Sequence, residues 1–205
     1  MISIINYGLG NIGAFANVYK RLSIPVQIVN TPDQLERAER IILPGVGAFD
    51  HAMDKLNRSG LRERLNQKVT VDKVPVIGIC VGMQMLAHRS DEGKLPGLGW
   101  VDAEVLRFDE AKLSGQQTRV PHMGWNDVNP IRSHPILTNL EHDARFYFLH
   151  SYYFKCNDPS DGLTRTDYGG EFVSAVQADN VFGVQFHPEK SLHYGIQLLK
   201  NFATL

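Results

Sequence analysis

Four short runs of apolar residues recur through the first eighty positions, and a stretch of helical character follows each of the first three. The runs cover residues 2–7, 26–29, 40–43 and 76–79. Helices are expected over residues 13–22, from Thr31, from Phe49 and from Leu61. Because parallel strands need crossover connections, usually helices, this alternation predicts an α/β fold built on a doubly wound, mostly parallel sheet.

The second half of the chain has a different texture, with short β-branched or aromatic runs separated by Gly, Pro and Asn. These runs predict added antiparallel strands over residues 103–108, 145–150, 152–156, 163–167, 171–177 and 181–186. A last amphipathic helix over residues 192–202 carries Ile196, Leu199 and Phe202 on one face. No repeat or linker interrupts the pattern, so we expect one domain over residues 1–205.

The charges are balanced, with 21 basic and 22 acidic side chains and a formal net charge of −1. Without a basic block, we expect no nucleic-acid partner and no polybasic membrane anchor. The apolar start of the chain is too short for a signal peptide or a membrane span. With two cysteines, Cys80 and Cys156, a disulfide scaffold is not expected, and a reducing cytoplasm fits best.

Gly78-Ile-Cys80-Val-Gly82 joins an apolar strand to a helix that we expect from Val81 to about His88. The pattern is the cysteine form of the nucleophile elbow, in which flanking glycines let the neighbouring backbone pack closely. A helix that begins here directs its positive end at the sulfur and favours the thiolate. A free cysteine is often only a small buried side chain, which is the reading we favour for Cys156. The two glycines favour a nucleophile at Cys80.

The second informative stretch is Phe-His187-Pro-Glu189, where an apolar strand ends. Pro188 forces His187 into extended geometry, and in an extended chain residues i and i+2 point the same way. A carboxylate on one imidazole nitrogen leaves the other free to accept a thiol proton. A competing interpretation is that His187 only caps a strand end and Glu189 is a solvated surface charge. The cysteine elbow makes this interpretation the less favoured one.

Two other sites are weighed and not favoured. Gly8, Gly10 and Gly13 match a dinucleotide fingerprint, but Asn30 stands where its acidic residue is expected, so a packed glycine turn is favoured and no cofactor is expected. The remaining histidines match no zinc-binding spacing, so no metal site is expected. They include His122, His134, His142, His150 and His193.

The motifs around Cys80 and His187 are similar to those of the class I, triad-type glutamine amidotransferases. Within this family the chain most closely resembles the glutaminase subunits of imidazole glycerol phosphate synthase, in histidine biosynthesis. Gly-x-Cys-x-Gly-x-Gln and His-Pro-Glu mark the family, and Pro-His-Met-Gly-Trp-Asn is more specific to this subfamily. The matching segments run in family order over residues 7–11, 44–49, 78–84, 121–126, 150–152 and 183–191.

The resemblance implies a flavodoxin-like sheet and a role for each of several positions. The catalytic triad would be Cys80, His187 and Glu189. The substrate L-glutamine would be held by Gln84 and by the backbone of Ser151 and Tyr152. The oxyanion hole would be formed by the backbone of Gly45, Val46 and Gly47 with the amide of Val81. The residues facing a partner would be Asn11, Trp125 and Lys190.

The resemblance also implies a heterodimer in which a (β/α)8 cyclase subunit consumes the ammonia. The oxyanion strand would respond to the partner's ligand state, with a carbonyl of residues 45–47 turned into the hole at rest. The segment from His88 to Phe108 is equally similar to paralogues that feed sugar amidotransferases of surface-polysaccharide assembly. A non-catalytic scaffold and a thiol hydrolase are further alternatives, against which the complete triad and Gln84 argue.

Overall fold

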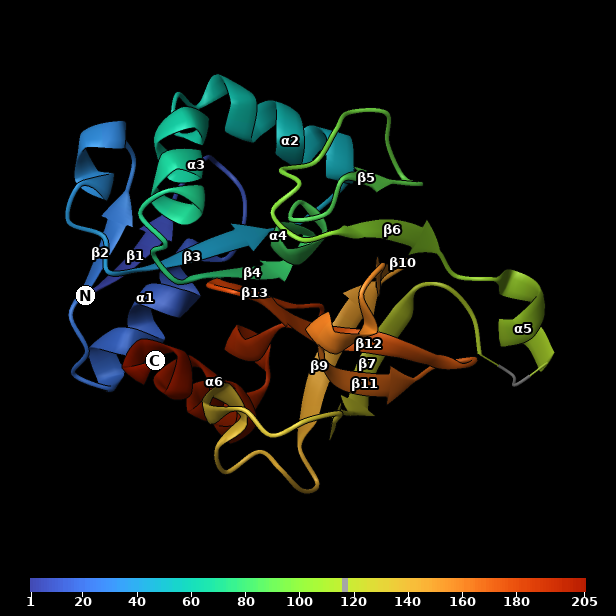
Figure 1. Ribbon diagram of the computed structural model, residues 1–205. Coiled ribbons are helices and arrows are strands. Elements are labelled where there is room, and N and C mark those ends of the chain that lie inside the picture. Colours follow the sequence, from blue (N-terminus) through green and yellow to red (C-terminus); the bar gives the residue numbers. More distant parts are fainter. Residues whose placement is uncertain (116–117) are drawn as a thin grey trace.

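The parallel half of a large sheet carries Cys80, the predicted nucleophile, at the end of one strand. The computed structural model describes residues 1–115 and 118–205 (Figure 1). Five strands pair in parallel in the order β2-β1-β3-β4-β13. Their bounds are β1 Ile2–Ile5, β2 Val26–Val29, β3 Arg40–Gly45, β4 Val76–Cys80 and β13 Val181–Val184. The carboxyl ends of parallel strands in such sheets are where ligands bind.

Helices cover both faces of this half. The two terminal helices, α1 (Ile12–Arg21) and α6 (Leu192–Thr204), contact each other on one face. On the other face lie α2 (Phe49–Arg58) and α3 (Arg62–Thr70) (Figure 1). A 3₁₀ turn, Pro32–Leu35, follows β2, and the one-turn helix α4 (Val81–Gln84) follows β4. The doubly wound α/β architecture is therefore confirmed.

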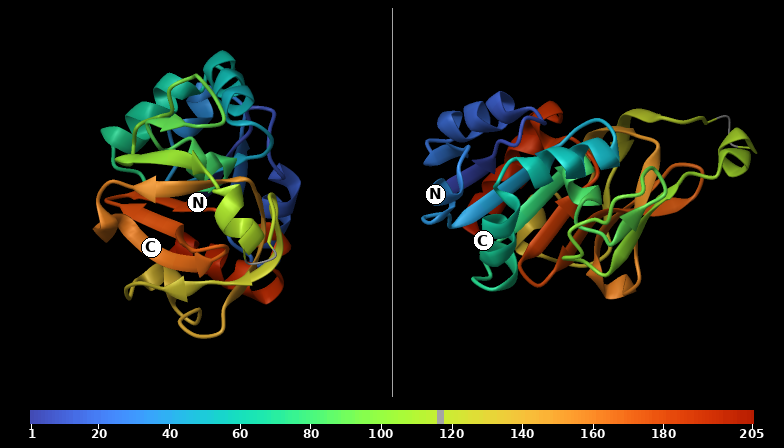
Figure 2. Two further views of the ribbon diagram at one scale, coloured as in Figure 1. Left: turned by 90° about the vertical axis from the view of Figure 1, so that its right-hand side faces the viewer. Right: turned by 90° about the horizontal axis from the view of Figure 1, so that it is seen from above.

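The sheet continues into an antiparallel half. After β13 its order is β12-β10-β6-β5; β11 pairs with β12, and β8 pairs with β11. All of these pairs are antiparallel except β5–β6, which is parallel. The bounds are β5 Arg89–Ser90, β6 Ala103–Arg107, β8 Asn129–Pro130, β10 Tyr152–Cys156, β11 Gly162–Asp167 and β12 Glu171–Ala178. These strands and the blue N-terminal elements occupy opposite ends of the molecule (Figures 1 and 2).

A separate two-stranded ribbon pairs β7 (His122–Asp127) with β9 (Arg145–His150). Its antiparallel register sets His122 opposite His150 and Trp125 opposite Tyr147. The remaining elements are short. They are α5 Glu110–Gly115 and the 3₁₀ turns Pro135–Leu137, Pro159–Asp161 and Pro188–Lys190.

A row of apolar side chains crosses the sheet in register and forms the centre of the core. Ile4 pairs with Ile42, Ile42 with Ile77, and Ile77 with Phe182. The three isoleucines are fully buried, and Phe182 is almost so. Each fully buried side chain of this size contributes about 1.5–3 kcal/mol to folding, so the row holds the four strand ends in place.

The helix expected from Val81 to about His88 is wrong beyond Gln84. The backbone that follows is bonded to a distant segment: the carbonyls of Met85 and Leu86 accept the amides of Leu98 and Trp100. Strand β5 then begins at Arg89, within the range where the helix was expected to have just ended. The strands β5, β7 and β8 were not expected, and the first and last predicted strands end two residues early, at Ile5 and Val184.

The final helix begins at Leu192 as expected and runs to Thr204. Leu199 and Phe202 are buried, whereas Ile196 is only half-buried and Gly195 and Leu198 complete the inner face. Among the described residues, no helix is both long and apolar enough to cross a membrane.

Candidate active site

Cys80 stands where β4 ends and α4 begins, in a strained backbone conformation. Its φ of 55° and ψ of −112° lie outside the regions that a residue with a side chain ordinarily adopts. Such strain costs about 1–3 kcal/mol and persists only when the surrounding structure enforces it. Cys80 is 4% exposed, with its sulfur at the carboxyl end of the parallel sheet. This is the elbow that the sequence predicts.

Close backbone contacts enforce the elbow. A Cβ atom at Gly82 would lie 2.0 Å from the carbonyl oxygen of Leu43, and one at Gly45 would lie 2.3 Å from the amide nitrogen of Gly82. Gly45 is the ladder partner of Cys80 across β3 and β4. The absence of side chains therefore brings Val46 and Gly47, the residues that follow β3, beside Cys80.

His187 and Glu189 pair as the i, i+2 spacing predicts. His187 Nδ1 lies 2.9 Å from Glu189 Oε1, and the two side chains are 6% and 2% exposed. The His187 amide donates to the Tyr147 carbonyl at 2.8 Å, which ties the loop after β13 to β9. Because β13 is the parallel neighbour of β4, His187 reaches Cys80 from the adjacent strand.

The imidazole of His187 sits between two groups that favour its charged form. Burial on its own lowers the pKa of His187, but hydrogen bonds to Cys80 and Glu189 and their negative charges outweigh it and raise that pKa to about 10. A protonated His187 supplies a full positive charge beside the sulfur. The expected help from a helix dipole is small, since α4 has one turn.

Further polar groups surround the sulfur. Cys80 Sγ lies 3.9 Å from the Leu149 carbonyl oxygen and 3.8 Å from Gln185 Nε2. The fully buried Gln185 accepts from Gln84 Nε2 at 3.1 Å, and the same Gln84 amide donates to the Tyr152 carbonyl at 3.3 Å. Both donors of Gln84 are therefore engaged, which leaves its carbonyl oxygen as the end available to a ligand.

A cavity of about 320 Å³ opens over these groups. It brings together Cys80, His187 and most of the predicted site. Its other lining residues are Val46, Gly47, Val81, Gln84, Glu92, Pro121, Leu149, His150, Ser151, Tyr152 and Lys190. Glu189 and Gly45 do not line the cavity. Glu189 bonds His187, and Gly45 is the ladder partner of Cys80. Asn11 and Trp125 do not line it.

A family model described as class-I glutamine amidotransferase matches residues 3–204. The chain belongs to this family. It is 60% identical to the imidazole glycerol phosphate synthase subunit HisH of Bdellovibrio bacteriovorus and 52% identical to that of Leptospira interrogans, over the full length of each pair. A solved glutamine amidotransferase structure, 20% identical, covers 100% of this chain and 99% of its own with a TM-score of 0.75, which confirms the fold.

An apolar rim of four exposed side chains extends from the amidotransferase cavity, which Val46 and Leu149 line, along the β7–β9 ribbon. Met123, Trp125, Leu149 and Val46 expose 65, 40, 39 and 37% of their surface. Trp125 meets the ring of Tyr147 edge-on at 6.4 Å between centroids, and the Lys190 ammonium lies 5.7 Å from the centroid of that ring. Asn11 is exposed at the start of α1 and makes no capping bond there. All three predicted partner residues are thus exposed at the surface.

The glycine turn before α1 packs as the favoured interpretation expects. Gly10 has φ +97°, and a Cβ atom there would lie 2.6 Å from Cβ of Pro44. The buried Tyr7 hydroxyl donates to the Pro44 carbonyl at 2.6 Å. The turn therefore holds the start of the predicted oxyanion strand. Which carbonyl of that strand turns into the hole at rest stays a prediction.

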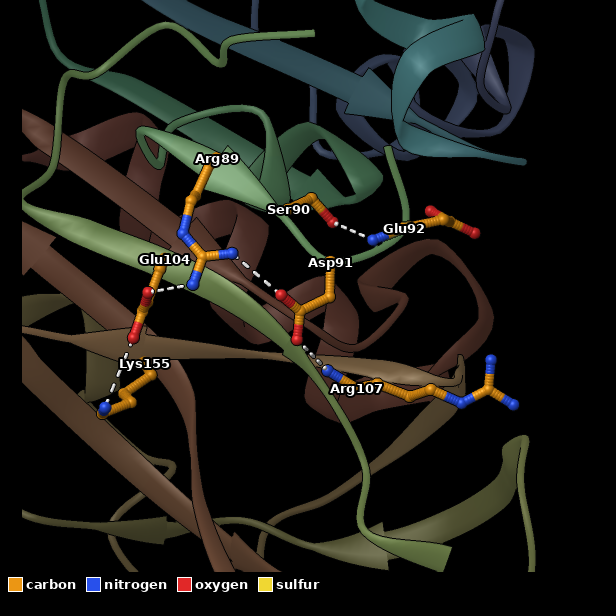
Figure 3. A network of polar contacts seen from close by, with 7 residues as sticks. All are labelled: Arg89, Ser90, Asp91, Glu92, Glu104, Arg107 and Lys155. Carbon is orange, nitrogen blue, oxygen red and sulfur yellow. Dashed lines mark hydrogen bonds and ion pairs between the residues drawn. The ribbon is translucent and has the colours of Figure 1, made fainter. Parts of the chain in front are cut away.

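Glu92 is a cavity residue that the sequence analysis missed. Its Oε2 accepts the Phe49 amide at 2.8 Å, and the Asp50 carboxylate in turn accepts the amides of Lys94 and Leu95 at 2.9–3.0 Å. Figure 3 shows the Ser90 hydroxyl accepting from the Glu92 amide at 3.1 Å. The loop that carries Glu92 is thus clamped to the first turn of α2.

Behind that loop the polar network of Figure 3 continues along β5 and β6. Arg89 bonds the carboxylates of Asp91 and Glu104, Lys155 also reaches Glu104, and the other Asp91 oxygen accepts the Arg107 amide. These side chains are mostly exposed, so the network contributes little stability but fixes the direction of the loop.

Other chemistry-bearing residues form no competing site. Burial, and then the charges of Asp161 and Asp158, raise the pKa of the Cys156 thiol to about 12, which suits an inert side chain. Across residues 1–115 and 118–205, no cluster of histidine, cysteine and carboxylate side chains has the arrangement of a metal site.

Proposed function

We propose that this chain, as one amidotransferase domain over residues 1–205, is the glutaminase subunit of an imidazole glycerol phosphate synthase. It hydrolyses L-glutamine to glutamate and ammonia and passes the ammonia to a (β/α)8 cyclase subunit. The observation that carries the proposal is the Cys80–His187–Glu189 arrangement at the floor of a cavity, in a chain 60% identical to a HisH subunit over its full length.

The reaction follows from the geometry. The Cys80 thiolate attacks the side-chain amide carbon of glutamine, and the electron pair of the carbonyl moves to its oxygen. The backbone amide of Val81 and those of the strand at residues 45–47 stabilise that oxyanion, and one such donor is typically worth about 3 kcal/mol. His187 gives its proton to the departing nitrogen, which leaves as ammonia, while Glu189 holds the ring.

Water then completes the cycle. His187, now neutral, accepts a proton from water as the hydroxide adds to the thioester carbon. The sulfur departs as thiolate, which regenerates the thiolate–imidazolium pair. The products are ammonia and glutamate, whose new carboxyl group gives up its proton to the solvent. No redox step or cofactor is needed, in agreement with the expectation that the site uses none.

The cavity offers complementary groups to an amino acid. The carboxylate of Glu92 and the carbonyl oxygen of Gln84 accept hydrogen bonds, which suits the α-ammonium group of glutamine. Ser151 and Tyr152 also line the cavity. An internal residue of a peptide has no α-ammonium group to pair with these acceptors, which argues against a thiol protease.

The exposed apolar rim of Met123, Trp125, Leu149 and Val46 supports a protein partner. A docked cyclase subunit would bury the rim, exclude water from the cavity and receive ammonia before it is protonated in solution. Asn11 and Lys190 would lie in the same interface. The two free cysteines support a cytoplasmic chain, and the balanced charge supports the absence of a nucleic-acid or membrane partner. The relatives found carry the HisH name, and nothing found supports the polysaccharide alternative.

The test is glutamate release by the purified chain, alone and with a histidine-pathway cyclase subunit and its nucleotide ligand. We expect slow turnover alone, a large increase with the cyclase, and none above background in Cys80→Ala. Strong turnover that is indifferent to the cyclase would contradict the partner assignment, and activity that survives Cys80→Ala would contradict the nucleophile.

A further inference from the structure

A buried pair of histidines connects the glutamine cavity to strand β7. His150 Nε2 lies 3.0 Å from His122 Nδ1, and the two residues are 5% and 2% exposed. His150 lines the cavity, whereas His122 does not. Burial first, and then the charges of His122 and His187, lower the pKa of His150 to about 3, and burial lowers the pKa of His122 to about 4. Both rings are neutral at pH 7.

The contacts at the cavity end decide where His150 carries its proton. His150 Nδ1 lies 2.8 Å from the Tyr152 carbonyl oxygen, which can only accept. The proton of the neutral ring is therefore on Nδ1, and Nε2 must accept. His122 Nδ1 then has to donate to it, which places the second proton on Nδ1 of His122 and leaves its Nε2 as an acceptor.

The contacts of Asn126, on the side of His122 away from the cavity, independently require the same positions for the two imidazole protons. Asn126 Oδ1 accepts the Asp127 amide at 2.8 Å, which fixes the orientation of the side-chain amide. Its Nδ2 donates to the Asp167 carbonyl at 2.9 Å and to His122 Nε2 at 3.2 Å. Both ends thus specify one ordered chain of donors, from Asn126 through His122 and His150 to the Tyr152 carbonyl.

That carbonyl is also an acceptor for Gln84 Nε2, at 3.3 Å. Its direction therefore determines how the Gln84 amide presents its oxygen to the cavity. We propose that His122 is a positioning residue for glutamine binding: by donating to Nε2 it holds the His150 ring where Nδ1 binds the Tyr152 carbonyl and, through that carbonyl, positions Gln84. The inference rests on the proposed glutaminase function and names a residue outside the cavity on which that site depends.

Two substitutions separate this role from packing. The His122 ring is stacked between Phe148 and Tyr168, at 4.6 and 3.9 Å between centroids. His122→Phe keeps an aromatic ring in that stack but removes the donor to His150. His122→Asn keeps a nitrogen donor near the position of Nδ1 but removes the ring. A packing role and a positioning role therefore predict opposite outcomes for the pair.

The experiment measures kcat and KM for glutamine with the cyclase complex of the wild type and both variants, with thermal unfolding of each. We expect His122→Phe to raise KM about tenfold, as the loss of one hydrogen bond implies, with kcat within about twofold. We expect His122→Asn to unfold at a lower temperature yet keep a KM near that of the wild type. A wild-type KM in His122→Phe, or equal increases in both variants, overturns the inference.

A spectroscopic measurement decides the same point without activity. The full-length chain labelled with ¹⁵N in histidine should show His122 and His150 neutral at pH 7 with the proton on Nδ1 of each. In His122→Phe the ¹⁵N shift of His150 Nε2 should change to that of a nitrogen without a hydrogen-bond donor, and in His122→Asn it should stay near the wild-type value. A charged ring, or a proton on Nε2 in the wild type, refutes the inference. An inactive wild-type complex contradicts the proposed function instead, because the tautomers are measured separately.

Discussion

The buried, neutral pair of His122 and His150 makes the free energy of unfolding depend on pH, and the size of this dependence can be calculated. An unfolded histidine has a pKa of about 6.5, whereas the folded chain lowers the pKa of His122 to about 4 and that of His150 to about 3, mainly by burial. Between those values the unfolded chain binds two protons that the folded chain does not. The free energy of unfolding therefore falls as the pH is lowered from 6.5.

The magnitude follows from proton linkage. Each ring contributes about 1.4 kcal/mol per pH unit once its unfolded form is fully protonated. At pH 6.5 each unfolded histidine is half-protonated. With this allowance, the pair lowers the free energy of unfolding by about 3 kcal/mol between pH 6.5 and pH 5. His187 contributes little in this window: the fold raises its pKa to about 10, so the folded form stays charged, and completing the protonation of the unfolded form offsets the loss by only about 0.4 kcal/mol. Its contribution to stability is instead lost as the pH rises from 6.5 toward 10.

The assay is urea unfolding of the purified chain at pH 6.5, 6.0 and 5.0, extrapolated to water. His122→Phe should roughly halve the loss between pH 6.5 and 5, because one of the two rings is gone. Partial burial, and then the charge of Arg132, also lower the pKa of His134. His134→Asn therefore measures how much this third histidine adds to the loss of stability at low pH. A free energy of unfolding that stays constant or rises on acidification would refute the argument that the pair is buried and neutral.

Three substitutions test other parts of the structure. Glu189→Gln should lower kcat by roughly three to four orders of magnitude in the cyclase-activated assay, because an amide neither fixes the tautomer of the His187 ring nor stabilises its positive charge; a loss below tenfold would contradict its role. Glu92→Gln should raise KM for glutamine with little change in kcat, unlike Glu104→Gln, which lies outside the cavity; equal effects would count against an ammonium contact. Gly82→Ala should destabilise by about 3 kcal/mol or more, since its Cβ would lie 2.0 Å from a carbonyl oxygen of β3. Gly13→Ala, with open space in α1, should stabilise by about 0.5–1 kcal/mol; similar urea midpoints for the two alanine variants would refute this steric account.

Local patterns were enough to predict the parallel half of the fold and the strained turn at Cys80. A buried strand that runs straight into Cys80 and Gly82 specifies its own turn, because only the absence of side chains allows the backbone to approach so closely. The pairing of His187 with Glu189 was also predictable, since two residues in an extended chain share a face. Their placement beside Cys80 depends on β13 pairing with β4, which no local signal specifies.

The wrong and missing elements share one physical cause. The helix after Cys80 ends at Gln84 because backbone groups of Met85 and Leu86 bond residues that lie more than ten positions away. Strand β7 was missed because Pro121 and Gly124 interrupt its pattern, and its stability comes from pairing with β9. Propensity and periodicity describe neighbours along the chain, so they cannot anticipate such long-range bonds.

The supporting residues of the site were missed for the same reason. Glu92 lies in a loop with ordinary charged neighbours, and Gln185 and His122 carry no spacing signal of a ligand or a base. His122 was interpreted as a scattered structural histidine. Only the fold shows that its ring faces His150 and that Gln185 lies between Cys80 and Gln84.

The central claim, that Cys80 is the nucleophile of a glutaminase, is tested most directly by covalent trapping. The cyclase complex would be treated with a diazoketone analogue of glutamine, which alkylates a nucleophile held against the amide position, and the labelled peptide would be identified by mass spectrometry. The account predicts label on Cys80, protection by glutamine, and activity lost in proportion to labelling. Full activity after Cys80 is labelled, or inactivation with the label on Cys156 instead, would contradict it.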